Sequence, residues 1–200
     1  MFSHDSTYSP FTLEHLRQSH IVIVGFGKEG ASTYSFLQAY IEPKSIVIFD
    51  EQPEVAAKFG EDGYSNPREL LKKVSTLTQI VVIKTPGIPL SHPVMQNLAK
   101  YELTSNTQLS FDLWETKAFK QLSGTGITSI GVTGTKGKST TASVIHHVLA
   151  ESGLFSRLAG NIGVPALDVL AELLSVSPDT LPERMQLVLE LSAHQLAELR

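Results

Sequence analysis

The segment at positions 131–140, GVTGTKGKST, combines glycine, hydroxyl and lysine side chains in a pattern that can hold a nucleotide triphosphate. Glycines let backbone N–H groups approach phosphate oxygens, and the start of a following helix adds partial positive charge. Lys138 supplies a full charge near the β and γ phosphates, and the hydroxyl of Ser139 can bind a magnesium ion. We therefore predict that ATP and Mg²⁺ bind here. The predicted ATP-binding residues are Gly134, Thr135, Lys136, Gly137, Lys138, Ser139 and Thr140.

The sequence on either side of this segment supports the prediction. An apolar run at 127–132 predicts a strand before it, and the pattern at 138–152 predicts a helix after it. The general pattern G-x-x-x-x-G-K-[ST] would place its first glycine at Val132, whereas glycines stand at 131 and 134. The alternative is a glycine-rich turn with an exposed lysine. The order of strand, turn and helix favours phosphate binding.

A second glycine-rich turn lies near the N-terminus. Residues 25–30, GFGKEG, form a complete G-x-G-x-x-G after an apolar run, and Asp50 follows twenty residues after Gly30 at the end of the next apolar run. This spacing predicts a turn that accepts a diphosphate, with a carboxylate placed for a ribose or base. It does not distinguish NAD from another nucleotide diphosphate. The alternative is a tight turn required for helix–strand packing.

Three shorter features are each compatible with two interpretations. Thr85-Pro86-Gly87 follows a strand, so it either faces the same crevice as the first turn or is only a rigid proline turn. Asn161, between two glycines, either binds a polar ligand or caps the helix that starts near Pro165. Glu190 ends a buried strand and either holds Mg²⁺, directly or through water, or is a strand end without a role.

The elements that must position these residues alternate along the chain. Apolar runs predict strands at 20–25, 45–49, 79–85, 127–132, 155–159 and 185–191. Helical patterns lie between them, at 28–40, 67–74, 92–101, 111–122, 138–152 and 165–174. Such alternation predicts an α/β fold with parallel strands and crossover helices. A small, polar segment at 123–126 predicts the domain boundary. We expect a Rossmann-like parallel-sheet domain over 1–122 and a truncated P-loop α/β ATP-binding domain over 123–200.

The composition of the chain argues against several classes of protein. The chain has 200 residues, a net charge of −4 and no cysteine. The charge argues against a general nucleic-acid binder, and the absence of cysteine excludes disulfides and thiolate metal sites. No apolar run is long enough to span a bilayer, and the polar N-terminus lacks the apolar core of a signal peptide. We expect a soluble, cytoplasmic protein that neither enters membranes nor binds nucleic acid.

Taken in order, these motifs resemble those of the Mur ligase family of peptidoglycan synthesis. The family loop reads G-x-x-G-T-x-G-K-[ST]-T, and residues 131–140 match it at every position. Gly160-Asn161-Ile162-Gly163 and Glu190-Leu191-Ser192 are similar to two further family motifs. The N-terminal motifs are similar to those of the members that add D-glutamate.

The resemblance implies a three-domain, ATP-dependent ligase whose C-terminal amino-acid-binding domain is absent from these residues. Its small-molecule substrates would be UDP-N-acetylmuramoyl-L-alanine and D-glutamate, and we expect a monomer. By family chemistry, an acyl phosphate forms first and the amine of D-glutamate then displaces phosphate. Lys138 and Glu190 would be the catalytic residues, with Ser139 and Glu190 serving magnesium. The residues implied to bind the sugar nucleotide are Gly27, Lys28, Glu29, Gly30, Asp50, Thr85, Pro86, Gly87 and Asn161.

Three other functions compete with this one. The chain could belong to a Mur ligase that adds a different amino acid. It could be a non-catalytic module that binds a UDP-sugar or a nucleotide. It could also be a nicotinamide oxidoreductase built on residues 25–30 and Asp50, although that interpretation leaves the segment at 131–140 unexplained.

Overall fold

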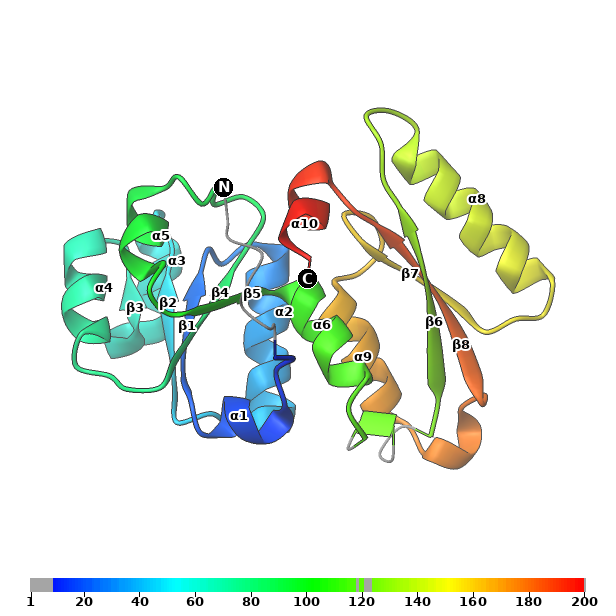
Figure 1. The fold of residues 1–200 in the computed structure, drawn as a ribbon, viewed down its shortest axis with the longest axis horizontal. Coiled ribbons are helices and arrows are strands. Elements are labelled where there is room, and N and C mark those ends of the chain that lie inside the picture. The colour runs from blue at the N-terminus through cyan, green and yellow to red at the C-terminus, as the bar shows by residue number, and fades with distance from the viewer. Residues whose placement is uncertain (1–8, 118, 121–123, 200) are drawn as a thin grey trace.

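The computed structural model describes residues 9–117, 119–120 and 124–199. These residues form two parallel β-sheets with helices on both faces of each (Figure 1). This is the α/β architecture that the alternation of apolar runs and helical patterns predicts. The predicted domain boundary between residues 122 and 123 falls outside the described residues, so the division of the chain stays a prediction. Among the described residues, no helix combines the length and the apolar character that crossing a bilayer would require.

The first sheet has five strands in the order β3-β2-β1-β4-β5, all parallel. Their bounds are β1 His20–Val24, β2 Ser45–Phe49, β3 Gly63–Tyr64, β4 Ile80–Lys84 and β5 Glu102–Ser105. The central strands β1 and β4 are almost continuously apolar because both of their faces are covered. All five strands end at the same edge, so the turns after β1, β2 and β4 lie next to one another.

Helices cover both faces of this sheet. On one face, α4 (Pro67–Val74) and α5 (Pro93–Leu98) pack against alternate residues of β1, β2 and β4. On the other face lie α2 (Lys28–Phe36), the π-helix η1 (Leu37–Ile41) and α6 (Asn106–Trp114). The remaining short elements are α1 Leu13–Arg17, α3 Pro53–Ala56 and the 3-10 helix η2 Ala57–Asp62.

The second sheet has three parallel strands in the order β6-β8-β7. They are β6 Gly126–Val132, β7 Ser156–Gly160 and β8 Arg184–Glu190. The helix α8 (Lys138–Glu151) packs on one face, and α9 (Ala166–Ser175) packs on the other. A short 3-10 helix, η3 Pro178–Thr180, precedes β8, and α10 (Ala193–Glu198) follows it.

The two sheets share one apolar core. The helix α9 lies between the two sheets, and α2 and α6 lie between α9 and the first sheet (Figure 1). Buried side chains of β1 and β4 therefore belong to the same cluster as Leu170 of α9 and Leu187 of β8. Asn106, at the start of α6, is buried within this interface. Its side-chain oxygen accepts from the N–H of Leu167 at 3.3 Å, and its amide donates to Thr33 of α2 at 3.1 Å.

Two predicted helices differ from those observed. The helix predicted at 28–40 is α-helical only to Phe36 and continues as a π-helix, because the N–H of Glu42 bonds to the carbonyl of Leu37 at 2.8 Å. The helix predicted at 111–122 is in part α6, which begins at Asn106 and ends at Trp114; beyond it, residues 117, 119 and 120 are helical again, and 118 and 121–122 lie outside the described residues. The helix α6 starts early because the hydroxyl of Ser105 accepts the N–H of Gln108 and so caps it.

An ion pair between β7 and α9 supports a prediction on the pH dependence of stability. The guanidinium of Arg157 is hydrogen-bonded to Glu172 and holds the pKa of that carboxyl below its ordinary value, although burial partly opposes this. A lowered pKa in the folded state stabilises the protein above the unfolded pKa of about 4.3, and this stabilisation is lost as the pH falls through the folded pKa. We expect Glu172→Gln to lower the free energy of unfolding at pH 7 by less than about 1 kcal/mol, because the pair is partly exposed.

The check is urea denaturation of both proteins at several pH values. The difference between them should shrink as the pH falls through the folded pKa of Glu172. A constant difference from pH 7 down to pH 3 would show that the charge of Glu172 contributes nothing.

Candidate active site

The loop between β6 and α8 forms an open anion cradle. Val132 ends β6, Gly137 caps α8 in the left-handed conformation, and α8 begins at Lys138. Residues 133–137 are exposed. In the part of the chain that the structure describes, the backbone N–H groups of residues 134–140 donate to no protein oxygen. Free donors at the start of a fourteen-residue helix are what an anionic phosphate requires.

Lys138 and Ser139 occupy the first turn of α8, at the point where the free N–H groups gather. Lys138 is half-buried, and Ser139 is exposed. No ion pair involves Lys138 among the described residues. Its ammonium is therefore available for an anionic ligand. Lys136 is also exposed in this loop, so two positive charges lie within three residues of each other.

Glu190 ends β8 on the same face of the sheet as this cradle. It pairs in register with Val132, and alternate residues of a strand share one face, so its side chain lies on the face of Val188 and α8. The residue is only 4% exposed, and Oε2 has no hydrogen-bond partner among the described residues. A buried carboxylate oxygen without a partner is costly unless a cation meets it. This observation fits a magnesium site.

The turn after β7 lies beside Glu190. The N–H of Asn161 donates to the carbonyl of Glu190 at 3.0 Å, which fixes this turn on the end of the central strand. Gly160 has a φ of +101°, and a Cβ atom there would lie 2.2 Å from the same carbonyl oxygen, so only glycine fits. The side chain of Asn161 is exposed. It caps no helix, because α9 begins at Ala166 after Pro165 without a side-chain cap.

The N-terminal glycine turn forms a second, partly exposed cradle at the edge of the first sheet, in which Gly27 and Lys28 are exposed while Gly25 and Gly30 are buried. Gly25 follows β1, Gly27 is the N-cap of α2, and Lys28 begins the helix. Thr85 packs directly against this turn. Its N–H donates to the carbonyl of Val24 at 3.0 Å and its hydroxyl donates to the same oxygen at 3.2 Å. The structure therefore brings Thr85, the first of the predicted residues 85–87, against the turn at 25–30.

Asp50 holds this turn in shape. Its carboxylate accepts from the N–H of Phe26 at 2.7 Å and from the N–H of Gln52 at 3.0 Å. The residue is half-buried, so it keeps an accessible face beside the turn. Asp50 thus has a structural role at the position where the sequence predicts a ligand-binding carboxylate, and the two roles are compatible because a carboxylate can accept about four hydrogen bonds.

The first turn of α2 contacts the segments that lie on either side of Glu190. The ammonium of Lys28 donates to the carbonyl of Gly163, in the turn that carries Asn161. The carboxylate of Glu29 accepts from the side-chain amide of Gln195 at 2.8 Å. Lys28 and Glu29, which the sequence predicts to bind the diphosphate, therefore also contact the segments around Glu190. Gln195 is a site residue that the sequence analysis did not identify. The S-x-x-Q capping pattern at 192–195 could have indicated the helix that positions it.

A matched pair of glycine variants tests the geometry of the N-terminal turn. Gly25 has a φ of +91°, and a Cβ atom would lie 2.2 Å from the hydroxyl oxygen of Thr85. At Gly27 a Cβ atom meets nothing within 4 Å. We expect Gly25→Ala to lower the free energy of unfolding by about 2 kcal/mol or more, and Gly27→Ala to change it by less than about 1 kcal/mol. Urea denaturation measures both; equal losses would contradict this geometry.

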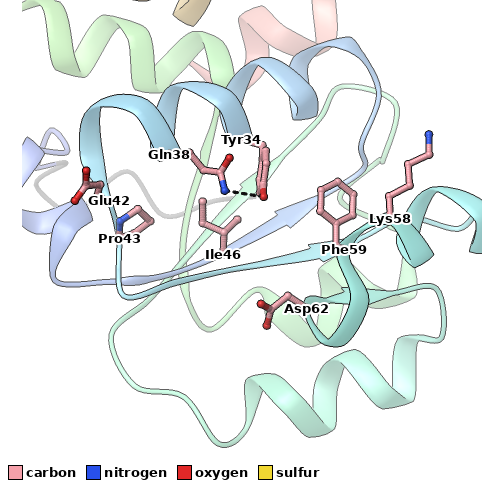
Figure 2. A pocket seen from close by; sticks show the side chains of 8 residues that line it. All are labelled: Tyr34, Gln38, Glu42, Pro43, Ile46, Lys58, Phe59 and Asp62. Carbon is pink, nitrogen blue, oxygen red and sulfur yellow. Dashed lines mark hydrogen bonds between the residues drawn. The ribbon is translucent and has the colours of Figure 1, made fainter.

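A separate open pocket lies on the face of the first sheet that carries α2, between α2 and η2 over β2 (Figure 2). Its volume is about 640 Å³. Phe59 and Tyr34 form an edge-to-face pair beside it, with ring centroids 5.3 Å apart. The pocket is lined by Tyr34, Gln38, Glu42, Pro43, Ile46, Lys58, Phe59 and Asp62. None of these residues belongs to either cradle, so the pocket is distinct from the candidate active site.

Comparison with known proteins shows which proteins the chain is similar to. Residues 132–200 match the family described as the Mur ligase middle domain. The chain is 31% identical over 182 residues to a UDP-N-acetylmuramoylalanine--D-glutamate ligase of Rickettsia bellii, a match that covers 90% of this chain and 35% of that protein. It is 32% identical over 163 residues to an enzyme of the same name from Listeria monocytogenes, which covers 77% of this chain and 33% of that enzyme.

A relative with a different name matches equally well. The chain is 31% identical over 191 residues to a UDP-N-acetylmuramoyl-L-alanine--L-glutamate ligase of Micromonospora sp., covering 94% of this chain and 37% of that enzyme. The chain thus spans about a third of the length of the curated relatives that it matches. By these matches, residues 132–200 resemble the Mur ligase middle domain, and most of the chain is similar to part of the ligases named above.

Proposed function

We propose that this chain is the nucleotide-binding part of an ATP-dependent ligase that joins glutamate to UDP-N-acetylmuramoyl-L-alanine. The observation that carries the proposal is the pairing of two features on one face of the second sheet. These features are the free N–H groups of residues 134–140 beside Lys138, and the buried, unpartnered Oε2 of Glu190. Together they are suited to a triphosphate and its metal ion. The N-terminal cradle, with Asp50 and Thr85, is suited to the sugar nucleotide.

The proposed chemistry begins at the carboxylate of the L-alanine group. One of its oxygens attacks the γ-phosphorus of ATP, the bond to ADP breaks, and an acyl phosphate results. The amine of glutamate then attacks the acyl carbon, phosphate leaves, and an amide forms. Activation is needed because an unmodified carboxylate has a poor leaving group.

The residues of this chain would bind and orient the reactants. Lys138 and the N–H groups of the cradle would balance the negative charge of the transferring phosphoryl group, which is the main source of catalysis in such reactions. Ser139 and Glu190 would hold Mg²⁺, and bound Mg²⁺ supplies further charge neutralisation at the phosphates. Asn161 would contact the muramoyl substrate or the ions. The cytoplasm is the proposed location, and D-glutamate the first-choice amino acid.

The L-glutamate ligase of Micromonospora favours a second candidate, in which the added amino acid is L-glutamate. An assay of phosphate release and amide formation by the full-length protein separates the two. With ATP, Mg²⁺ and UDP-N-acetylmuramoyl-L-alanine present, we expect turnover with D-glutamate and none with L-glutamate. The reverse result would establish the second candidate.

Two controls test the proposal itself. We expect no turnover when UDP-N-acetylmuramic acid without L-alanine replaces the substrate, and turnover with that compound would assign the chain to a different step. Binding of ATP and the UDP-sugar without phosphate release would indicate a binding module. Tight NADH binding without UDP-sugar binding would overturn the ligase proposal in favour of an oxidoreductase.

A further inference from the structure

Consecutive residues in the first turn of α2 contact the two segments on either side of Glu190. Lys28 donates to the carbonyl of Gly163 in the turn after β7. Glu29 accepts from the side chain of Gln195 in α10, just after β8, with an Oε1–Nε2 distance of 2.8 Å. The same helix turn follows the N-terminal cradle directly. The first turn of α2 is therefore next to the proposed sugar-nucleotide site and also contacts the turn after β7 and the helix α10, which lie on either side of Glu190.

Gln195 uses both ends of its amide. Its Oε1 accepts from the N–H of Ser192 at 2.9 Å, while its Nε2 donates to Glu29. The hydroxyl of Ser192 in turn accepts from the N–H of Gln195 at 3.1 Å, which completes a capping box. Gln195 is only 3% exposed. Its amide thus fixes the backbone two residues after Glu190 to α2 and orders the start of α10.

The backbone around Glu190 is held on its remaining sides as well. The N–H of Leu191 donates to the carbonyl of Val132 at 2.9 Å, which ties the strand end to the start of the ATP-binding loop. The carbonyl of Glu190 accepts from Asn161, whose turn Lys28 contacts through Gly163. A shift of the first turn of α2 would therefore be transmitted to Glu190 through two separate connections.

The rest of α2 and the following η1 are anchored to the second sheet's helix α9. The hydroxyl of Tyr40 donates to the carbonyl of Ala171 at 3.1 Å, and buried Asn106 bridges Thr33 and the N–H of Leu167. Because these contacts hold the body of the helix against α9, its first turn has a defined position relative to Glu190. Buried, fully used hydrogen-bonding groups of this kind fix one arrangement rather than several.

We propose that Glu29 and Gln195 are positioning residues that couple the two cradles, so that a diphosphate bound at residues 25–30 raises the affinity of the 134–140 loop for Mg²⁺ and ATP. The inference rests on the proposed function. A ligand on the first cradle holds the first turn of α2 in the conformation that bonds Gln195, and the same bond orders the segment that carries Glu190. Linkage requires the effect to be reciprocal, so Mg²⁺ and ATP strengthen binding of the diphosphate by the same factor.

The test uses an isosteric substitution and its compensating partner. In Gln195→Glu, one carboxylate oxygen can still accept from Ser192, so the capping box survives, but the other faces the carboxylate of Glu29. In the double variant Glu29→Gln with Gln195→Glu, the amide and the carboxylate exchange places and the hydrogen bond is restored. Gln38→Glu is the matched control, because it makes the same chemical change on η1 at an exposed residue whose side chain bonds only to Tyr34 within the described structure.

The measured quantity is the ratio of the dissociation constants for a non-hydrolysable ATP analogue with Mg²⁺, determined by calorimetry on the full-length protein without and with saturating UDP. This ratio does not depend on the affinity for UDP itself. We expect about a tenfold ratio in the wild-type protein and in Gln38→Glu, within the usual range for coupled sites. In Gln195→Glu it should fall below about twofold, and the double variant should recover most of it.

A wild-type ratio near one, or a tenfold ratio that persists in Gln195→Glu, would overturn the coupling while leaving the proposed function intact. If the wild-type protein binds neither UDP nor the ATP analogue, both the proposed function and the coupling are wrong. If Gln195→Glu and the double variant lose the coupling equally, the bond between residues 29 and 195 does not transmit it.

Discussion

The Lys138→Ala variant is expected to bind ATP about a hundredfold more weakly than the wild-type protein and to bind the UDP-sugar with unchanged affinity. A hydrogen bond to a charged group contributes about 1.5–3 kcal/mol, and each 1.4 kcal/mol is a factor of ten. Lys138 lies in the first turn of α8, whereas the UDP-sugar is proposed to bind at the edge of the other sheet. Because the two sites use different residues, only one affinity should change. Calorimetric titration with each ligand gives both values.

A second lysine in the same loop is the matched control. Lys136→Ala removes the same charge from an exposed position, and we expect only about a threefold loss of ATP affinity, as for other solvent-screened charges. Circular dichroism should show all three proteins folded. Loss of both ligands in a folded Lys138→Ala protein would mean that the two cradles are not separate sites.

Replacing Glu190 with glutamine should have opposite effects on function and on stability. The substitution removes the charge proposed to hold Mg²⁺, so Mg²⁺ should no longer tighten ATP binding, and turnover by the full-length protein should fall by about a hundredfold or more. In the absence of ligands the variant should be more stable, because a buried carboxylate oxygen without a partner no longer has to be kept out of water. A gain of about 1 kcal/mol would raise the melting temperature by about 2–4 °C.

Thermal unfolding with and without Mg²⁺ and ATP tests both parts. The wild-type melting temperature should rise when both ligands are added, and that of Glu190→Gln should not respond to Mg²⁺. Glu183→Gln serves as the control, because Glu183 is exposed next to the opposite end of β8. A Glu190→Gln protein that melts lower than the wild type yet keeps its response to Mg²⁺ would show that Glu190 stabilises the fold and binds no metal.

The sequence predicted those parts of the fold that depend on local pattern. The strand at 45–49 and the helix at 67–74 have the predicted bounds, because continuous apolar residues and a proline at the first helical position are strong local signals. The predicted bounds of α6 were wrong because the start of this helix is marked only by its N-cap, Ser105, and because its buried face is largely polar. Residues 106–110 are all buried, although four of the five are polar, so no apolar stripe marks the helix. Side chains of three of these polar residues form hydrogen bonds to neighbouring elements or within the helix.

In the candidate site, too, the features that depend on local sequence could be predicted, and those that depend on packing could not. The glycine turns, Asp50 and Glu190 could be found from sequence because each stands in a fixed place relative to a strand end. The bond between Glu29 and Gln195 could not, because it joins residues 166 positions apart and depends on how α2 packs on the second sheet. The double use of Asp50, as a support for the Phe26 N–H and as a candidate ligand group, likewise became visible only from the hydrogen bonds.

The position of α9 between the sheets determines whether fragments of the chain can fold alone and how the intact chain unfolds on heating. Leu170 of α9 is fully buried in a cluster that also contains Phe36, from the helix α2 of the first sheet. Neither half keeps a closed interior when separated, so a fragment cut between β5 and β6 would expose this apolar surface and tend to aggregate. The intact chain should lose its structure in one calorimetric peak, and a ligand that stabilises either half should move that single peak for the whole molecule.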